Sequence, residues 1–492
     1  MKLKLQLIIE SDSGETEVVQ EVTKLERHSL RPENLGLTLS EAKELLQEVQ
    51  RAMVTHQGTG YVTQQIPCPK CGKIQSRKGK HQIVLRTLFG KLRLDSPRLY
   101  HCGCCSKEEY RSFSPLAELL TERTAPELSY LENKFAAMIS YGLTAELLAE
   151  VLPIGGDINI AGVYRNLQGV AERMETELGE EKWQFIDGCQ RDWDRLPPPR
   201  LPLIIGIDGG FIHAKDQKSR GEGWFEVIAG KSMPEEGAAK CFAYVQTYDT
   251  KPKRRLFELM KSQGLQANQQ VTFPSDGADD VRELPLYLSP ESEHWLDWFH
   301  VAMRLRVMGQ MAKGLVNEQN MTSAQEPLTE LGEELDRVDI DKQLERVKWF
   351  LWHGNVVVAL DTIEDIEDEL DLPPMNGESR KKLLKAVREF RGYIEANQNF
   401  IPNYGDRYRH GEKISTAFAE SAVNQVVSKR IVKKQQMRWS EPGAHNLLQV
   451  RTKVSRKLWF ISSGVNFDYV FSSDGYVSES HVFISNECSR DL

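Results

Sequence analysis

The sequence predicts a mixed α/β protein of several domains, and three observations support this prediction. Five of the eight cysteines lie between Cys68 and Cys105, short apolar segments gather between residues 203 and 299, and a Pro-rich segment at 196–202 separates the two regions. A chain of 492 residues is long enough for two or more domains. No apolar run approaches the roughly 20 residues that span a bilayer, so we expect a cytosolic protein without a membrane partner.

Charge is segregated along the chain, although the net charge is -8. Residues 67–101 carry nine Lys and Arg against one Asp, and residues 424–457 carry nine against one Glu. Residues 326–380 instead carry sixteen Asp and Glu against five Lys and Arg. This pattern indicates basic surfaces that bind phosphates and one acidic module that faces solvent.

The N-terminal region predicts a small hairpin within residues 1–30 and then a helix. Thr38 and Glu41 match a capping box, and apolar residues recur at helical spacing from Ala42 to Met53. This apolar stripe indicates a core or docking face and no particular chemistry.

The clustered cysteines predict a zinc site. Cys68-x-x-Cys71 is followed about thirty residues later by Cys102-Gly-Cys104-Cys105, and two such knuckles suit four thiolates around one zinc ion. Either Cys104 or Cys105 can supply the fourth ligand, and the two-residue spacing favours Cys105. The alternative is a reduced cluster without metal.

Basic residues between the knuckles, including Arg77, Lys78 and Lys80, predict a zinc ribbon that contacts the DNA backbone, unless the ribbon only stiffens its domain. Residues 115–178 then alternate short helical segments with Gly turns. They fit a helix-turn-helix whose later helix, with Arg165, enters a groove, but many helical bundles share this pattern.

After the Pro-rich linker, five strands are predicted: Leu203–Asp208, Trp224–Ala229, Cys241–Thr247, Val271–Ser275 and His294–Phe299. The first three form an antiparallel meander. Asp208 ends the first strand and Asp276 follows the fourth, and each precedes a Gly. Two adjacent strand-end carboxylates can share a divalent metal ion, although Asp-Gly is also a common turn signal. Asp279, Asp280 and Glu283 rank below Asp276 because they fall on a following helical turn.

A final helix carries Glu420, followed on its basic end by Lys429 and Arg430, which we expect to contact DNA phosphates. Glu420 can complete a carboxylate triad for in-line phosphoryl transfer, or it can be a solvated helix-start carboxylate favoured by the helix dipole. The 144 residues between Asp276 and Glu420 are too long for one loop and predict an all-helical, acidic insertion.

The chain resembles the RNase H-like DDE transposases of bacterial insertion sequences, most closely the ISKra family and more loosely Mutator-like elements. The shared order is a strand ending at Asp208, a strand followed by Asp276, a helical insertion, and a helix that carries Glu420. The segments that carry the resemblance are Ile205 to Gly210, Pro274 to Pro285, Leu296 to Arg304 and Glu420 to Ala444. It runs from about residue 37 to about residue 453 and includes the cysteine module; the aromatic-rich end beyond 455 departs from it.

The resemblance implies an RNase H-like catalytic domain with Asp208, Asp276 and Glu420 holding Mg²⁺ (or Mn²⁺). It implies a DNA transposase that binds terminal inverted repeats, cleaves double-stranded DNA, joins it to target DNA and acts as at least a dimer. Asp297-x-x-His300 matches a family motif in which His300 orients DNA, and Arg438 and Trp439 are candidate DNA contacts; a structural Asp–His pair and a core Trp are equally good interpretations.

Rival functions are a zinc-dependent DNA-binding regulator on an inactive nuclease-like scaffold, and a nuclease that hydrolyses DNA without joining it. The expected domains are an N-terminal segment (1–60), a zinc ribbon (61–112), a helical DNA-binding domain (113–195), a catalytic domain in two parts (203–299 and 411–455), the helical insertion (300–410) and a C-terminal tail (456–492).

Overall fold

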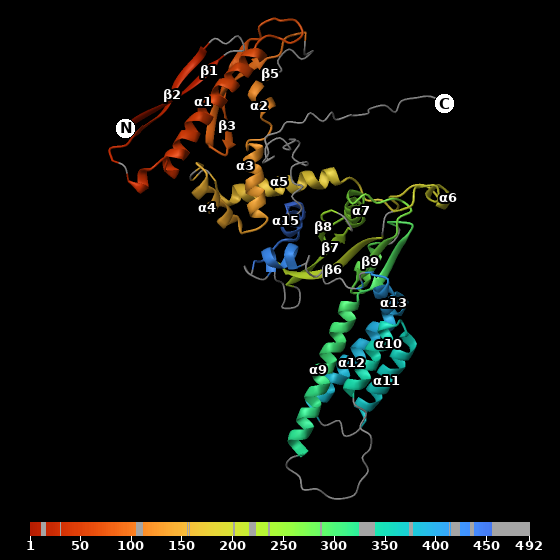
Figure 1. Cartoon of the computed structure of the whole chain (residues 1–492). Coiled ribbons are helices and arrows are strands. Elements are labelled where there is room, and N and C mark those ends of the chain that lie inside the picture. Colours follow the sequence, from red (N-terminus) through yellow and green to blue (C-terminus); the bar gives the residue numbers. More distant parts are fainter. Residues whose placement is uncertain are drawn as a thin grey trace, which may run out of the picture.

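The computed structural model confirms a mixed α/β architecture and describes residues 1–10, 16–29, 31–104, 112–154, 156, 158–199, 202–215, 223–234, 237–285, 288–323, 340–372, 377–412, 414, 424–432 and 437–454. An N-terminal module, a central sheet covered by helices, and a helical bundle follow one another along the molecule (Figure 1). Glu420 and Cys105 lie outside the described residues.

The N-terminal module begins with the expected hairpin. β1 (Lys2–Glu10) pairs antiparallel with β2 (Thr16–Glu26), a short 3-10 turn, η1, spans Pro32–Asn34, and α1 (Leu39–Gln65) follows. The predicted capping box is present, since the Thr38 side chain accepts a hydrogen bond from the backbone of Glu41 and the Glu41 side chain accepts one from the backbone of Thr38. The Glu41 carboxylate also pairs with Arg27, which ties the hairpin to the helix.

A second sheet follows in the order β3 (Arg77–Thr87), β4 (Gly90–Tyr100) and β5 (Ser112–Phe113). Along β4, buried and exposed side chains alternate as a half-buried strand requires. Leu92 and Leu94 pack with Ile83 and with Leu116 of α2 (Pro115–Leu119). The exposed side chains of β4, on the opposite face of the strand, include charged ones.

Three helices form the next region: α3 (Pro126–Ala136), α4 (Tyr141–Val151) and α5 (Ile160–Leu178); a short α6 spans Gln190–Trp193. One face of α5 is apolar, and its Val163, Leu167 and Val170 lie in the same hydrophobic cluster as the central sheet. The predicted helical domain therefore shares its core with the sheet that follows the Pro-rich linker.

The central sheet contains β6 (Leu203–His213), β7 (Trp224–Met233), β8 (Cys241–Val245), β9 (Val271–Ser275) and β10 (Ser292–Leu296), in the order β10-β9-β6-β7-β8. The β6-β7-β8 meander is antiparallel, as predicted. β9 and β10 run parallel to β6. α7 (Pro252–Ser262) makes the crossover between β8 and β9, and α8 (Asp279–Glu283) follows β9.

Two hydrophobic clusters cover the two faces of this sheet. Ile205 and Ile207 point into the cluster that contains α7. Ile212 points into the other cluster, with α5, η4 (Asn424–Val432) and α15 (Glu441–Val454). η4 is a π-helix, a conformation that is rare and is found frequently at functional sites. The face of the sheet that η4 covers is therefore a candidate location for a functional site.

The first predicted strand was too short. β6 does not end at Asp208 but continues to His213, paired with β7 along its length. Gly209 and Gly210, which suggest a turn in the sequence, instead stay extended opposite Ile228 and Val227. Asp208 therefore lies in the middle of a strand, where its backbone is fixed on the β7 side.

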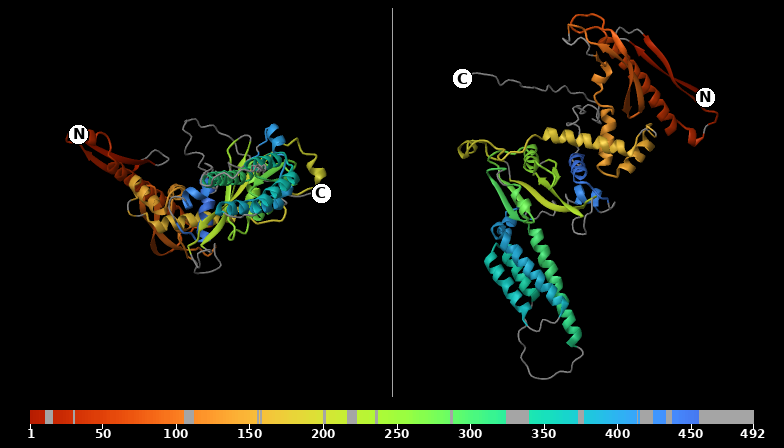
Figure 2. Two further views of the ribbon diagram at one scale, coloured as in Figure 1. Left: turned by 90° about the horizontal axis from the view of Figure 1, so that it is seen from below. Right: turned by 180° about the vertical axis from the view of Figure 1, so that it is seen from behind.

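The insertion is helical, as predicted. α9 (Trp298–Ser323), α10 (Ile340–Trp352), α11 (Val356–Asp371) and α12 (Glu378–Asn397) form a bundle that projects from the β10 side of the sheet (Figures 1 and 2). The 3-10 turn η3 (Gln398–Phe400) and α13 (Tyr404–Arg409) lead back to the sheet. Within the described parts of the chain, none of the helices has the length and apolarity needed to cross a bilayer.

Candidate active site and cysteine cluster

Three aspartates lie on or directly after three neighbouring parallel strands: Asp208 within β6, Asp276 after β9 and Asp297 after β10. β6 pairs with β9 at Leu203–Val271 and Ile204–Thr272, and the same sequence offset relates Asp208 to Asp276. The register between β9 and β10 pairs Ser275 with Leu296, and one further step brings Asp276 level with Asp297. Neighbouring strands are about 4.8 Å apart, so these offsets, if kept beyond the paired residues, arrange the three backbones in one row.

Asp208 is buried, with 9% of its surface exposed. Side chains alternate between the two faces along β6. Ile205 and Ile207 face the α7 side, whereas Ile212, an even number of residues from Asp208, faces η4 and α15. Its carboxylate therefore points to the face of the sheet that η4 covers. A carboxylate at such a place needs a cation or hydrogen-bond donors to offset desolvation.

Asp276 is held in a tight turn at the end of β9. Its Oδ1 accepts a hydrogen bond from the Ala278 N–H at 3.1 Å, and its carbonyl accepts one from the Tyr393 hydroxyl at 2.8 Å. Gly277 has φ +84°, and a Cβ there would collide with Asn397. The helical bundle therefore fixes this turn from one side, and only glycine fits in it without strain.

Asp297 is fully buried, and its Oδ1 accepts a hydrogen bond from the Phe299 N–H at 3.0 Å. The His300 Nε2 lies 3.8 Å from its other oxygen, Oδ2. The structure thus brings the predicted Asp297–His300 pair together at the start of α9, with His300 partly exposed. This geometry allows His300 either to orient the Asp297 carboxylate or to contact a ligand through its exposed part.

Burial and negative charge act together on the tyrosine beside this row. The pKa of Tyr393 is raised above its ordinary range, first because the hydroxyl is buried and also because Asp276 and Asp297 are near, while Arg304 opposes the shift. Tyr393 thus remains a neutral hydrogen-bond donor. Behind the turn, burial and then the charge of Arg282 lower the pKa of His294 to about 4, so His294 is neutral where it hydrogen-bonds the Ser275 hydroxyl at 2.8 Å.

The third expected catalytic residue, Glu420, falls outside the described residues. The next described element is η4, which packs on the face to which Asp208 points. Lys429 of η4 is exposed, as is Arg438 beyond it. Both are placed where they can contact a ligand on the protein surface.

Two predicted DNA contacts are buried instead, so their assignment was wrong. Arg430 is 1% exposed and Trp439 6% exposed. The Arg430 guanidinium lies 5.4 Å from the ring centres of both Tyr141 and Trp439, and its Nε donates to the Ala136 carbonyl at 3.3 Å. Burial lowers the pKa of Arg430. Both side chains join the C-terminal helices to α3 and α4 and cannot reach a nucleic acid.

Four cysteines meet at the base of the β3–β4 hairpin: Cys68, Cys71, Cys102 and Cys104, whose sulfurs all lie within 4.8 Å of one another. The Cys68–Cys104 and Cys71–Cys102 Sγ distances are both 3.4 Å, near the roughly 3.8 Å expected between thiolates that bind one zinc ion at 2.3 Å. The fourth sulfur of the described cluster is thus that of Cys104, whereas the spacing favoured Cys105, which lies outside the described residues. This donor set fits zinc.

The backbone around Cys68 has the shape of a metal knuckle. The Cys68 N–H donates to the Lys73 carbonyl at 2.9 Å, and the Gly72 N–H donates to the Cys68 carbonyl at 2.8 Å. Gly72 has φ 70°, which favours glycine. Hydrogen bonds from Cys104, first from its backbone and then from its side chain, lower the pKa of Cys102 and favour the thiolate that a metal requires.

The residues predicted to contact DNA in the N-terminal half are exposed. Arg77, Lys78 and Lys80 lie at the start of β3, close in sequence to the cysteine cluster, and Arg165 lies on the exposed face of α5. Its neighbour Val163 is buried in the core. α5 therefore offers only part of its surface to a ligand.

A second group of metal-ligand types, Glu175, Asp249 and His445, has its ligand atoms within 4.8 Å of one another. Arg255 already supplies the positive charge there, since its Nε lies 2.6 Å from the Asp249 carboxylate and its Nη2 lies 2.5 Å from that of Glu175. The sequence contains no signal for this group because its three members come from distant parts of the chain. It is a structural network that joins α5, α7 and α15.

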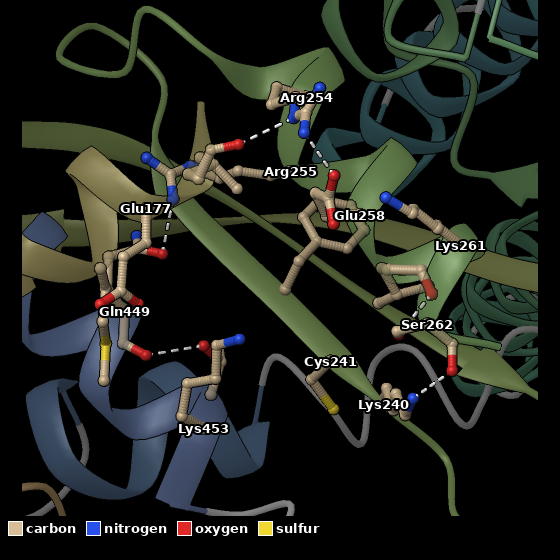
Figure 3. Close-up of a pocket in the computed structure, with 15 residues that line it drawn as sticks. Glu177, Lys240, Cys241, Arg254, Arg255, Glu258, Lys261, Ser262, Gln449 and Lys453 are labelled. Carbon is tan, nitrogen blue, oxygen red and sulfur yellow. Dashed lines mark hydrogen bonds and ion pairs between the residues drawn. The ribbon is translucent and has the colours of Figure 1, made fainter. Parts of the chain in front are cut away.

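A cavity of about 630 Å³ lies beside this network, where α5, α7 and α15 end next to β8 (Figure 3). Two of its basic residues donate hydrogen bonds to carbonyls at these helix ends. Lys240 Nζ donates to the Ser262 carbonyl, and Arg254 Nε donates to the Leu178 carbonyl. Arg254 also pairs with Glu258. Since helix C-termini attract cations, these charges stabilise the fold, and none of the three aspartates lines the cavity.

No protein-family model matches the chain, and no curated protein matches it. Function is therefore inferred from the residues themselves. Sequence reasoning singled out Asp208, Asp276 and Asp297 but missed Tyr393 and Tyr404. The Tyr404 hydroxyl donates a hydrogen bond to the Leu296 carbonyl at 2.6 Å. No sequence signal distinguishes these tyrosines from ordinary core aromatics of the bundle.

Proposed function

We propose that the chain is a DNA transposase of the DDE type, a metal-dependent enzyme that cleaves DNA at the ends of a mobile element and joins them to target DNA. The observation that carries the proposal is that Asp208 lies on β6 and Asp276 directly follows the neighbouring parallel strand β9, at the sequence offset of the paired residues Leu203 and Val271. The order of strand, strand, helical bundle and η4 agrees with the order expected from the resemblance.

The oxygen donors of Asp208 and Asp276 suit a hard divalent cation such as Mg²⁺. Mg²⁺ bound there supplies charge that activates an attacking hydroxyl and stabilises the leaving oxygen. Asp208 is held by the β6–β7 pairing, and Asp276 by its own turn and by Tyr393. Such fixed carboxylates lower the reorganisation needed during the reaction. Glu420 is proposed as the third carboxylate.

The N-terminal module is proposed to bind the terminal repeats. The four-cysteine cluster would hold zinc and fix the base of the β3–β4 hairpin, whose outward residues Arg77, Lys78 and Lys80 are exposed. Lysine and arginine bind phosphates without regard to base sequence. Since two element ends must be brought together, a dimer or larger assembly is expected on DNA.

The test is a cleavage and joining assay with labelled duplexes that carry the ends of the encoding element, in Mg²⁺ or Mn²⁺. Asp208→Asn, Asp276→Asn and Glu420→Gln should each reduce product by about a thousand-fold, because several kcal/mol of transition-state stabilisation are lost. DNA binding should remain. Glu412→Gln is the matched control, because Glu412 is exposed and paired with Arg407 at 2.9 Å.

Each rival has its own outcome. DNA binding without metal-dependent cleavage on authentic ends would favour the zinc-dependent regulator. Cleavage without joined products would favour a nuclease. Full activity of Glu420→Gln with loss of activity in Glu412→Gln would move the third carboxylate to Glu412.

A further inference from the structure

The helical bundle has opposite charges on two opposite sides. α11 carries seven Asp and Glu and no Lys or Arg. From Trp298 to Leu315, α9 carries Arg304, Arg306 and Lys313 and no Asp or Glu. In the described part of the bundle α9 packs against α10 and α12, and α11 packs against the same two helices. α9 and α11 are thus diagonal, and the acidity of the insertion belongs to the side away from α9.

The cations of α9 face solvent. Arg304 and Arg306 are exposed, and among the described residues neither has a carboxylate partner. Lys313 is exposed and makes a 3.5 Å contact with Asp341; exposed pairs of this kind contribute about 0–1 kcal/mol. By contrast, the α11 carboxylates Glu367 and Asp371 pair with Arg388 of α12. The positive charge of α9 is therefore available to a ligand.

α9 also starts at the row of aspartates, because Trp298 follows Asp297 directly. Its 26 residues extend about 39 Å at 1.5 Å per residue, close to the roughly 34 Å of one turn of duplex DNA. Arg304 lies next to the site, with its guanidinium 4.2 Å from the centre of the Tyr393 ring. A duplex with one phosphate at the aspartates can thus follow α9 outward.

We propose that the exposed face of α9, with Arg304, Arg306 and Lys313, binds the phosphate backbone of the DNA flanking the cleaved position, while α11 faces away from it. This inference rests on the proposed function, because it takes its starting point from the catalytic row. It assigns the insertion a direct role in holding DNA, although the net charge of residues 326–380 by itself indicates the reverse.

The test measures binding of the full-length protein to a labelled duplex of about 30 base pairs, roughly three helical turns, over a range of salt concentrations. Arg306→Gln with Lys313→Gln should reduce the slope of log affinity against log salt by about 2, since each phosphate contact contributes about 0.9. The matched control is Lys348→Gln with Arg409→Gln, which removes the same charge from residues paired with Glu345 and Asp406. The control should leave the slope unchanged.

The outcomes separate this inference from the proposed function. An unchanged slope in Arg306→Gln with Lys313→Gln, with cleavage intact in the wild type, would overturn the α9 assignment alone. A reduced slope without any metal-dependent cleavage would support the α9 surface and reject the transposase. Absence of DNA binding by the wild type would overturn both.

A protein partner is the remaining alternative for this face. α9 exposes an apolar stripe of Met303, Val307 and Met311, which are 42%, 41% and 36% exposed. Met303→Ser with Val307→Ser should leave the salt slope unchanged. If this variant instead abolishes self-association measured by light scattering, and the charge variant keeps the wild-type slope, α9 is an interface between copies of the chain and the DNA assignment is rejected.

Discussion

The Tyr393 hydroxyl donates a hydrogen bond to the main-chain carbonyl of Asp276 at 2.8 Å. This contact joins the helical bundle to the turn that presents a proposed catalytic carboxylate, across 117 residues of sequence. Asn397, one turn further along α12, packs against Gly277 of the same turn. The bundle therefore has a role in the candidate site, because its helix α12 fixes the position of Asp276.

Tyr393→Phe should lower the rate of DNA cleavage by about ten-fold. A looser Asp276 turn would lose about 1.4 kcal/mol of transition-state stabilisation, which corresponds to a factor of ten. The lost hydrogen bond should lower the free energy of unfolding by only about 1 kcal/mol. The variant should also require a higher Mg²⁺ concentration for half-maximal cleavage. Cleavage rates at saturating DNA, measured over a series of Mg²⁺ concentrations, test this.

The control for this prediction is Tyr408→Phe, since Tyr408 is 63% exposed and lies away from the turn. Equal cleavage rates and equal metal requirements in both variants would mean that Tyr393 stabilises the bundle without positioning Asp276.

The sequence predicted the five strands of the central sheet for a definite reason, although β7 continues to Met233 and β10 ends at Leu296 instead of Phe299. The strands from Leu203 to Leu296 are short apolar runs with polar or glycine boundaries, and such runs specify their own conformation. Their level placement could not be derived, because register depends on the pairing of distant strands. The end of β6 was missed because Gly209 and Gly210 favour a turn locally, whereas pairing with β7 keeps them extended.

Removal of zinc should unfold the base of the β3–β4 hairpin. The full-length protein should contain one equivalent of zinc by elemental analysis, and Cys104→Ser should reduce it strongly because four thiolates complete the coordination of a structural site. Cys189→Ser should keep its zinc, since Cys189 is exposed and not part of the cluster. Retained zinc in Cys104→Ser and its loss in Cys105→Ser would instead assign the fourth ligand to Cys105.

Neighbouring basic residues of η4 should behave oppositely when they are neutralised. Arg430→Met should lower the free energy of unfolding by about 1–3 kcal/mol, because the Ala136 carbonyl loses its donor, and should leave the salt dependence of DNA binding unchanged. Lys429→Gln should leave stability unchanged and reduce the salt slope by about 1. Chemical denaturation and binding titrations of both variants would test this contrast; a reduced slope in Arg430→Met would contradict its structural role.

These two residues show why a basic segment alone does not define a DNA surface. Lys429 and Arg430 are adjacent in sequence, yet one is exposed and the other is 1% exposed. Arginine enters cores more readily than lysine, because its guanidinium stacks on aromatic rings and is weakly hydrated. Tyr141 and Trp439 supply those rings from distant parts of the chain, so tertiary packing decides the role and the local pattern does not.

The Glu175 network should make stability depend on pH in the acid range. Burial alone would raise the pKa of Glu175, but hydrogen bonds and charge interactions with His445 and Arg255 outweigh burial and lower it to about 2. The ordinary value is about 4.3, so the folded state holds the proton less tightly than the unfolded state. The stabilisation is therefore complete above about pH 4.3 and is lost as the pH falls towards 2.

Glu175→Gln should consequently lower the free energy of unfolding at neutral pH by about 1–2 kcal/mol, after allowance for partial exposure of the carboxylate to solvent. The difference from the wild type should shrink as the pH falls from about 4 towards 2, because the wild-type carboxylate becomes protonated there. Denaturant unfolding at several pH values would measure this difference, with Glu258→Gln, whose partner Arg254 is on the same helix, as the control. A difference that is constant from pH 7 to the acid range would show that the variant acts through packing, because only a titrating carboxylate makes the loss depend on pH.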